Sequence, residues 1–375
     1  MDLSYSSEQT QLKDSVERFV KDNYPLENRR KLVASDEGFS RAHWKTYAEL
    51  GWLGVALPEE YGGIGGTAVE TMIIMEAIGR GLVVEPYLST VVLGGTAVLA
   101  GGSDALKKEI LPAIAEGKLL MAFAQAEKQS RFDLHDVALA AKKAGKGWSL
   151  SGHKAVVHHA AAADKIVVVA RTSGQSRDTD GITLFLVDKG AKGLSRRDYR
   201  TIDGLRASEL TFADVAVGAD AVLGAEGKGL ALLEKVVDHG IAAVCSEAVG
   251  AMHVLHDTTL EYLKTRQQFG RPLGAFQVLQ HRMTDMFMAY EQSRSMAMMV
   301  NLKLDESDTE RKKAASAAKV QIGKSGRFVG QQSVQLHGGM GMTDELNVGH
   351  YFKRLTMIDT QFGNTDWHLE RFGRL

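Results

Sequence analysis

The sequence has a single cysteine, no long apolar run and no excess of charge of either sign. Cys245 is the only cysteine among 375 residues, which excludes an internal disulfide and any zinc site built from several cysteines. A lone thiol suits a reducing compartment, so we expect a cytoplasmic location. Lysine and arginine together number 45, against 46 aspartates and glutamates. Binding to nucleic acid or to an anionic membrane, which needs a basic excess, is therefore not expected.

The most apolar stretch, Thr90 to Gly102, is too short to cross a membrane. It spans 13 residues, four of them glycine, whereas a membrane-spanning helix needs ~20. The first residues, Met1 to Glu8, are polar and acidic, unlike a secretory signal. A length of 375 residues, with 44% hydrophobic and 24% charged side chains, instead indicates a globular protein of two or three domains.

The hydrophobic pattern predicts a helical domain over residues 1–121 and a β-domain over 122–225. Ser6 with Gln9 is typical of a helix start, and helical patterns follow over 41–50, 68–80 and, more weakly, 91–117. Short β-branched runs at 165–170 and 181–187 predict strands, as do weaker patterns at 147–157 and 209–217. Because no long helical pattern separates these strands, we expect an antiparallel sheet or small barrel.

Residues 226–375 predict a four-helix bundle. Leu230, Leu233, Val237, Ile241 and Val244 begin an apolar stripe at helical spacing that continues to about residue 266. Three more helical patterns cover 276–304, 310–336 and 345–372. Four long helices joined by short connections favour an antiparallel bundle, so the fold class is mainly α with an inserted antiparallel β-domain.

Some familiar motifs fail on inspection. Gly63–Ala68 matches a relaxed dinucleotide-binding pattern but does not follow a strand. Gly323–Ser325 resembles the end of a phosphate-binding loop, yet Ala318 stands where the first glycine is required. His253 and His256 lie one helical turn apart, with no acidic or cysteine ligand at zinc-motif spacing nearby. We therefore expect no Rossmann site, no P-loop and no metal.

Three other segments carry a more specific signal. They are Leu50–Gly63, Tyr262–Arg282 with its Arg266–Gly270 block, and Gln335–Gly341. On these segments, and on the order of its domains, the chain resembles the acyl-CoA dehydrogenase flavoprotein family over essentially its whole length. Within that family it is most similar to the small subunit of bacterial two-subunit enzymes such as pimeloyl-CoA dehydrogenase.

The resemblance implies FAD as cofactor and an acyl-CoA as substrate, which is converted to a trans-2-enoyl-CoA in fatty acid or dicarboxylic acid degradation. Electrons would leave through an electron-transferring flavoprotein, and the chain would assemble as a tetramer, either of identical chains or with a larger acyl-CoA dehydrogenase subunit. The rival interpretations are a catalytically silent structural subunit, or a flavin oxidase or monooxygenase on the same fold.

The resemblance also implies which residues reach the adenosine half of a shared FAD. The expected cofactor-binding residues are Arg266, Phe269, Gln277, Gln335, Gly338 and Gly339. Their chemistry agrees with that role, because an arginine fork suits a pyrophosphate and a phenylalanine packs on a flat ring. The glycines allow the backbone to approach phosphate closely and to donate N–H groups.

The β-domain departs from the family motif on the flavin-ring side. Where the family has threonine, this chain has Ala126, and where it has a glycine–serine pair the chain has Arg131-Phe132. A tryptophan that shields the flavin is replaced by Val156, and a threonine by His158. We therefore expect the chain to contribute the adenosine side of a flavin site and not the ring side.

The catalytic base is missing from both positions that the family uses. The position before the family's glycine–threonine pair is Gly363, and the alternative position on the first bundle helix is Gly240. If this chain supplies a carboxylate base, we predict Glu247, seven residues along the same helical face, ~10.5 Å further along the axis. The alternative is that Glu247 is hydrogen-bonded between bundle helices. Asp238 and His239, which flank Gly240, are the other candidates.

Overall fold

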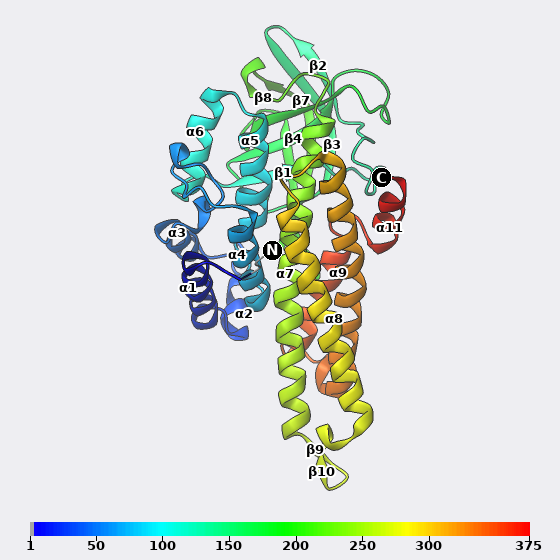
Figure 1. The fold of residues 1–375 in the computed structure, drawn as a ribbon. Helices are drawn as coiled ribbons and strands as arrows, with labels where there is room; N and C mark the ends of the chain where they lie inside the picture. The colour runs from blue at the N-terminus through cyan, green and yellow to red at the C-terminus, as the bar shows by residue number, and fades with distance from the viewer. Residues whose placement is uncertain (1–3) are drawn as a thin grey trace. The chain divides into compact units, whose positions relative to one another are not determined.

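The computed structural model describes residues 4–375, and the contacts among them divide the chain into two compact units (Figure 1). One unit holds the chain up to Lys31, Ala68–Val83 and Ile241–Leu375, and the other holds Leu32–Thr67 and Val84–Gly240. Each unit is made of segments that are separate in the sequence, whereas the sequence predicts three consecutive domains. The boundaries of those three domains stay a prediction. None of the helices in residues 4–375 combines the length and the apolar character that crossing a membrane requires.

The first unit is a helical bundle, as the sequence predicts. Its long helices are α7 (Leu230–Thr265), which belongs to this unit from Ile241 onward, α8 (Gln277–Leu302) and α9 (Asp308–His337). They lie side by side with alternating direction (Figure 1). Two shorter helices, α10 (Val348–Thr360) and α11 (Thr365–Arg374), pack on α9. The unit also includes α1 (Ser7–Asn23), α4 (Ala68–Gly81) and the first part of α2 (Leu26–Ala34). Ser6 and Gln9 form the expected capping box at the start of α1.

Helices α4 and α7 cross at unusually close range because a glycine faces backbone on each side. A Cβ on Gly79 would lie 1.9 Å from the carbonyl oxygen of Glu247. Reciprocally, a Cβ on Gly250 would lie 1.9 Å from the carbonyl oxygen of Glu76. Neither position can therefore carry a side chain without separating the two helices, and the contact fixes how the segment 68–83 joins the bundle.

The second unit contains an eight-stranded sheet with the order β6-β7-β3-β2-β4-β5-β8, and β1 pairs with β4 outside this path. The strands are β1 (Met121–Ala124), β2 (Ala140–Ala144), β3 (Gly147–His158), β4 (Lys165–Arg171), β5 (Ile182–Asp188), β6 (Leu194–Arg200), β7 (Arg206–Val217) and β8 (Val222–Leu223). Neighbouring strands are antiparallel, as expected, except that β1 runs parallel to β4 and Ala140 of β2 pairs in parallel with Arg171 of β4.

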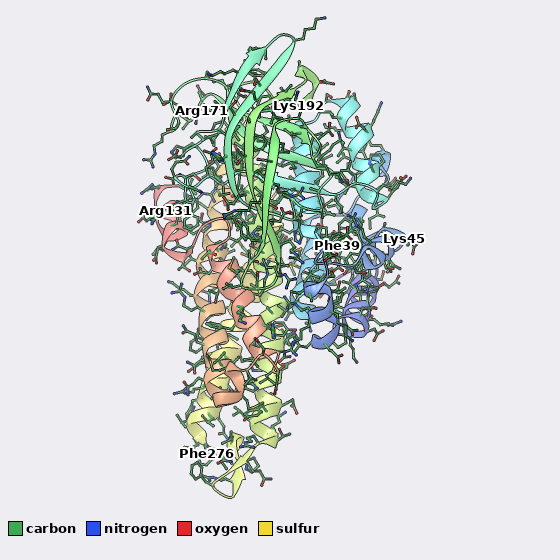
Figure 2. All side chains as sticks on the ribbon, turned by 180° about the vertical axis from the view of Figure 1, so that it is seen from behind. Phe39, Lys45, Arg131, Arg171, Lys192 and Phe276 are labelled. Atoms are coloured by element: carbon green, nitrogen blue, oxygen red, sulfur yellow. The ribbon has the colours of Figure 1, made fainter. Side chains whose placement is uncertain are left out.

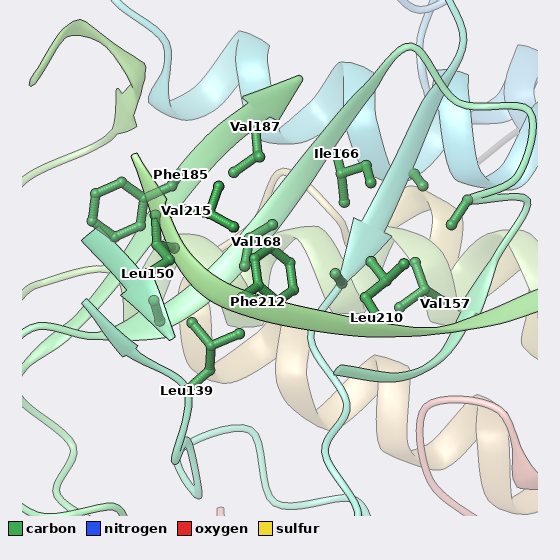
Figure 3. Packing of buried hydrophobic residues seen from close by; sticks show 14 of the residues in the cluster. Leu139, Leu150, Val157, Ile166, Val168, Phe185, Val187, Leu210, Phe212 and Val215 are labelled. Carbon is green, nitrogen blue, oxygen red and sulfur yellow. The ribbon is translucent and has the colours of Figure 1, made fainter. Parts of the chain in front are cut away.

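The core of this unit lies between the inward faces of the strands (Figure 3). Leu150 on β3, Leu210 and Phe212 on β7, and Val168 and Phe185 on β4 and β5 are all at most 3% exposed. Burial on this scale excludes water from the strand backbones and holds the sheet rigid. The rigid sheet thereby fixes the positions of the loops that join its strands.

The helices of the second unit are short. They are α3 (Arg41–Glu49), α5 (Thr96–Gly101), α6 (Asp104–Ala115), the π-helical turn η3 (Leu88–Gly95) and the 3₁₀ turns η1 (Trp52–Gly54), η2 (Glu59–Tyr61) and η4 (Ala219–Ala221). Ser40 and Ser103 cap α3 and α6 with their hydroxyl groups. The single helical pattern predicted over 91–117 is thus divided among three elements: η3 ends at Gly95, α5 ends at Gly101, and α6 begins after Ser103.

The C-terminal pattern predicted as one helix over 345–372 is two helices. The chain leaves α10 at Thr360 and restarts as α11 at Thr365, where the Asn364 side chain accepts a hydrogen bond from the Trp367 N–H at 3.0 Å. Gly363, inside the break, has φ of +116°, which is incompatible with a continuing helix. The hydrophobic period continues across the break, so the pattern alone did not reveal it.

Candidate functional site

Three of the predicted cofactor-binding residues lie on or beside one hairpin at the end of the bundle. The hairpin joins α7 to α8 through two short strands, β9 (Gln267–Gln268) and β10 (Arg271–Pro272), and Phe276 next to it marks this end of the bundle in Figure 2. Arg266 precedes β9, and its carbonyl accepts the Leu273 N–H at 2.8 Å, which closes the hairpin. Gln277 opens α8 and is exposed.

Phe269 stands at the tip of the hairpin and is 88% exposed. Its φ of +55°, followed by +75° at Gly270, is the backbone of a tight two-residue hairpin turn. The Phe269 ring meets Phe276 edge-on at 6.1 Å between centroids, and the Arg271 guanidinium lies 4.1 Å over the Phe276 ring. The Phe269 ring is therefore accessible to a molecule that would pack on it.

The other three predicted residues lie where α9 ends. Gln335 is exposed in the last turn, and Gly338 and Gly339 follow in the 3₁₀ turn η6 (Gly338–Met342). Gly338 has φ of +60°, and among the described residues no atom beyond the adjacent chain lies within 4 Å of the place where a Cβ would stand on either glycine. The backbone here is therefore open to a large ligand.

Two contacts join these groups of residues into one cluster, which we call the bundle-end cluster. The ring of Tyr262, near the end of α7, stacks on His337 at the end of α9, with centroids 4.4 Å apart. Arg282 on α8 donates to Gln332 on α9 at 3.2 Å. The structure thus brings all six predicted cofactor-binding residues to the same end of the bundle, with every one exposed.

The bundle-end cluster fits the adenosine half of FAD. Arg266 has no ion-pair partner within residues 4–375, so its charge remains available for a pyrophosphate. Backbone N–H groups at an open glycine pair, an exposed aromatic ring and two amide side chains complete a set of groups that suits a nucleotide. These residues could hold FAD, although their individual roles stay a prediction.

The β-domain segment that matches the flavin-ring motif has a structural role. Glu127 is buried and forms a 2.6 Å ion pair with the fully buried Lys154. Its carboxylate also accepts the N–H groups of Ala138 and Leu139. Burial by itself raises the pKa of Glu127, but Lys154 and these hydrogen bonds outweigh it and hold that pKa below its usual range. Glu127 is thus a fixed anion that anchors the loop.

The β-domain lacks several of the groups that the family motif places against the flavin ring. Val156, in place of the shielding tryptophan, is 44% exposed with φ of +52°. A hollow of about 570 Å³ opens nearby against β3, β6 and β7, and it is lined among others by Lys128, His153 and Arg197. Most of the described residues that line it are polar or charged, and His153 carries the one aromatic ring among them.

Glu247, the predicted carboxylate, is buried and engaged. It is 3% exposed, and its two oxygens accept from Nε and Nη2 of Arg354 on α10 at 2.5 and 2.6 Å. A bidentate, buried pair of this kind joins α7 to α10. Both oxygens are therefore committed within the bundle, which favours the alternative that Glu247 is hydrogen-bonded between helices.

The other positions considered for the base are Gly363, Asp238 and His239, and they differ in how far they are buried. Gly363 is buried in the turn between α10 and α11, and its carbonyl accepts from the Lys319 ammonium at 2.9 Å. Asp238 is fully buried on α7, and His239 beside it is partly buried. The sequence did not identify Lys319, which has no motif around it and is recognised only from its burial in the folded chain.

Comparisons with known proteins extend along almost the whole chain. Family models described as the N-terminal, middle and C-terminal domains of acyl-CoA dehydrogenase match residues 6–118, 122–215 and 227–374. The chain is 29% identical to mitochondrial isovaleryl-CoA dehydrogenase of Arabidopsis thaliana, covering 97% of this chain and 90% of the relative. It is 30% identical to 3-(aryl)acrylate reductase of Clostridium sporogenes, covering 86% of each protein.

A solved structure of an acyl-CoA dehydrogenase is also similar to this chain over almost its whole length. A variant of the Tcur3481-Tcur3483 steroid ACAD superposes with a TM-score of 0.89 at 30% identity, covering 98% of this chain and 97% of the other.

Proposed function

Because the chain belongs to the acyl-CoA dehydrogenase family, whose enzymes use FAD, we propose that it is the smaller subunit of a two-subunit acyl-CoA dehydrogenase. The family's reaction removes a proton from the α-carbon and a hydride from the β-carbon of an acyl-CoA thioester, and leaves a trans-2-enoyl-CoA. In our proposal this chain provides the adenosine side of a flavin site, and a larger partner provides the ring side and the base.

One observation carries the proposal: the expected adenosine half of the flavin site has its binding groups, whereas the expected ring half lacks several of them. The bundle-end cluster keeps a charged arginine, an exposed ring, two amides and an open glycine pair. The β-domain has lost the hydroxyl groups and the tryptophan that meet the ring, and Val156 stands exposed in their place. A flavin needs both halves, so the missing half must come from another chain.

The chain's own residues would bind and orient the cofactor. Arg266 would neutralise the pyrophosphate, with the N–H groups of Gly338 and Gly339 as further donors. Phe269 would exclude water from the adenosine by covering its ring, and Gln277 would fix its orientation through an amide. When bound, FAD supplies the hydride acceptor. Electrons would then pass to an electron-transferring flavoprotein, as in the family.

Glu247 enters the proposal as a structural residue. General-base catalysis needs a carboxylate within hydrogen-bond reach of the proton that it removes. Both oxygens of Glu247 are bound by Arg354 inside the bundle, so neither is available to a thioester. The base for the α-proton would therefore belong to the partner. The pair of chain names in the Tcur3481-Tcur3483 steroid ACAD supports an assembly of two different chains.

The test is the flavin content of the complex formed with a larger acyl-CoA dehydrogenase chain taken from the neighbouring genes. Arg266→Ala should reduce bound FAD at least about tenfold at limiting FAD, because one charged phosphate contact is lost. Lys264→Ala is the matched control, since Lys264 is an exposed cation on the same helix end, paired with Glu261 at 2.7 Å. The control should leave the FAD content unchanged.

The rival in this test is a structural subunit without a part in flavin binding. It is favoured by the glycines at both base positions, Gly240 and Gly363. A structural subunit predicts that Arg266→Ala and Lys264→Ala retain the same FAD content as the unaltered complex. Equal FAD content in all three would therefore reject the half-site and leave assembly as the role of this chain.

A further inference from the structure

From the turn between α10 and α11 we infer that this chain cannot carry a catalytic base at position 363, even if a glutamate is restored there. The inference deepens the proposed function, on which it rests: the base is absent because the turn is closed against a side chain, and not merely because a carboxylate was lost. The base must then come from the partner chain. The argument depends on the space at Gly363, on the backbone around it and on the residues that hold both.

No space for a side chain exists at position 363. A Cβ built on Gly363 would lie 2.6 Å from Cε3 of Trp367 and 2.7 Å from Nε2 of His368. Both distances are far below van der Waals contact, and the atoms belong to rings and not to the flexible end of a long side chain. The φ of +116° adds backbone strain for any residue other than glycine.

The two rings have little freedom to move away. His368 is fully buried, its Nε2 lies 3.1 Å from the Phe362 carbonyl oxygen, and its Nδ1 lies 3.3 Å from Oγ of Ser316 on α9. Trp367 meets the His368 ring edge-on at 4.8 Å, and the Arg371 guanidinium lies 5.7 Å over the indole. Because the two rings pack against each other, neither can move away from Gly363 without displacing the other.

A buried lysine fixes the backbone of the same turn. The ammonium of Lys319 on α9 is fully buried and donates to the carbonyl oxygens of Ile358, Asp359 and Gly363 at 2.6, 3.1 and 2.9 Å. Three donors thus meet three acceptors, which leaves none of these carbonyls unpaired inside the bundle. The Gly363 carbonyl is directed into the protein by this contact.

The opposite side of the turn is held by Asp359. Its carboxylate accepts the hydroxyl of Thr365 at 2.9 Å and the Arg327 guanidinium at 2.8 Å. The first residue of α11 is thereby tied to the end of α10. Because Lys319 and the buried Asp359 both hold the turn, the backbone at 363 cannot rotate to a conformation with room for a carboxylate unless several buried bonds break together.

The experiment places glutamate at position 363 and at a matched control position, in the co-purified complex. Gly145, in the β2–β3 turn, has φ of +58° and no atom within 4 Å of its Cβ position. Gly145→Glu therefore also places a side chain on a positive-φ backbone, but in the left-handed region that other residues can adopt and without the contacts. We expect Gly363→Glu to lower the thermal midpoint at least about 5 °C more than the control. We expect it to give no gain in acyl-CoA turnover per bound FAD.

The other possible outcomes of this experiment either support the closed turn or overturn it. A Gly363→Glu complex that fails to fold, while Gly145→Glu folds, supports the closed turn. A Gly363→Glu complex with the thermal midpoint of the control overturns it, whatever its activity. So does a gain in turnover of tenfold or more. If this chain purified alone holds one FAD per chain, the proposed function fails, yet the difference in thermal midpoint still tests the turn.

Discussion

His368 is a buried imidazole that should make the C-terminal helices sensitive to acid. Burial, with the charges of Lys319 and Arg371 nearby, lowers its pKa from 6.5 to about 2. In the unfolded chain the ring binds a proton as pH falls through 6.5, whereas in the folded chain it stays neutral. The stability contributed by the neutral ring is therefore present above pH 6.5 and is lost below it, by about 2 kcal/mol at pH 5.

Urea unfolding near pH 7 and near pH 5, for the unaltered chain and for His368→Gln, measures this effect. Glutamine does not titrate, so the variant should be less stable near pH 7 but should lose less of its remaining stability on acidification. The difference between the two losses should be about 2 kcal/mol. Equal losses in the two proteins would show that His368 does not govern the acid response.

At the scale of the elements, the sequence predicts the long helices well and the polar strands poorly. Helix α7 was expected because one apolar stripe runs along it without interruption. Strand β6 was not expected, because five of its seven residues are exposed and show no alternation of polar and apolar side chains. It exists through pairing with β7, which is information that a local pattern does not contain. Helix α2 was missed for the related reason that only Arg29 in it is buried.

Helices α7 and α10 are joined by the Glu247–Arg354 pair, and Glu247→Gln should act on stability and not on turnover. The variant leaves the buried guanidinium without its counter-charge, which typically costs about 3–5 kcal/mol. We expect a lower thermal midpoint for the complex and less than a tenfold loss of turnover per bound FAD, or about 1.4 kcal/mol of barrier.

Glu261→Gln, an exposed position on the same helix, serves as the control and should change neither quantity. A loss of turnover beyond tenfold in Glu247→Gln, at an unchanged thermal midpoint, would identify Glu247 as the base after all.

At the scale of the whole molecule, the sequence predicts the bundle-end residues and shows that the base is missing at Gly363, but not that the turn there is closed. The bundle-end cluster could be predicted because its residues fall in two contiguous motifs. The closed turn could not, since Gly363 is obstructed by Trp367 and His368 and held by Lys319 from a separate helix. Only the folded chain shows these contacts.

The assembled enzyme should deliver its electrons to a protein acceptor and not to oxygen. Acyl-CoA dehydrogenases pass electrons to an electron-transferring flavoprotein, and this chain belongs to that family. After anaerobic reduction by an acyl-CoA, the complex should be reoxidised by an electron-transferring flavoprotein at least about tenfold faster than by air-saturated buffer. Stopped-flow absorbance of the flavin measures both rates. Faster reoxidation by oxygen would favour the oxidase or monooxygenase alternative.

The most direct test of the central claim is the ratio of FAD to protein chains, measured by flavin absorbance and quantitative amino-acid analysis. If this chain provides only the adenosine side, it should retain almost no FAD when purified alone. In complex with its larger partner, this chain should hold one FAD for each pair of chains. A complete site needs the adenosine side of this chain and the ring side of the partner, and each pair of chains forms one such combination. One FAD per chain in an assembly of this chain alone would contradict the account.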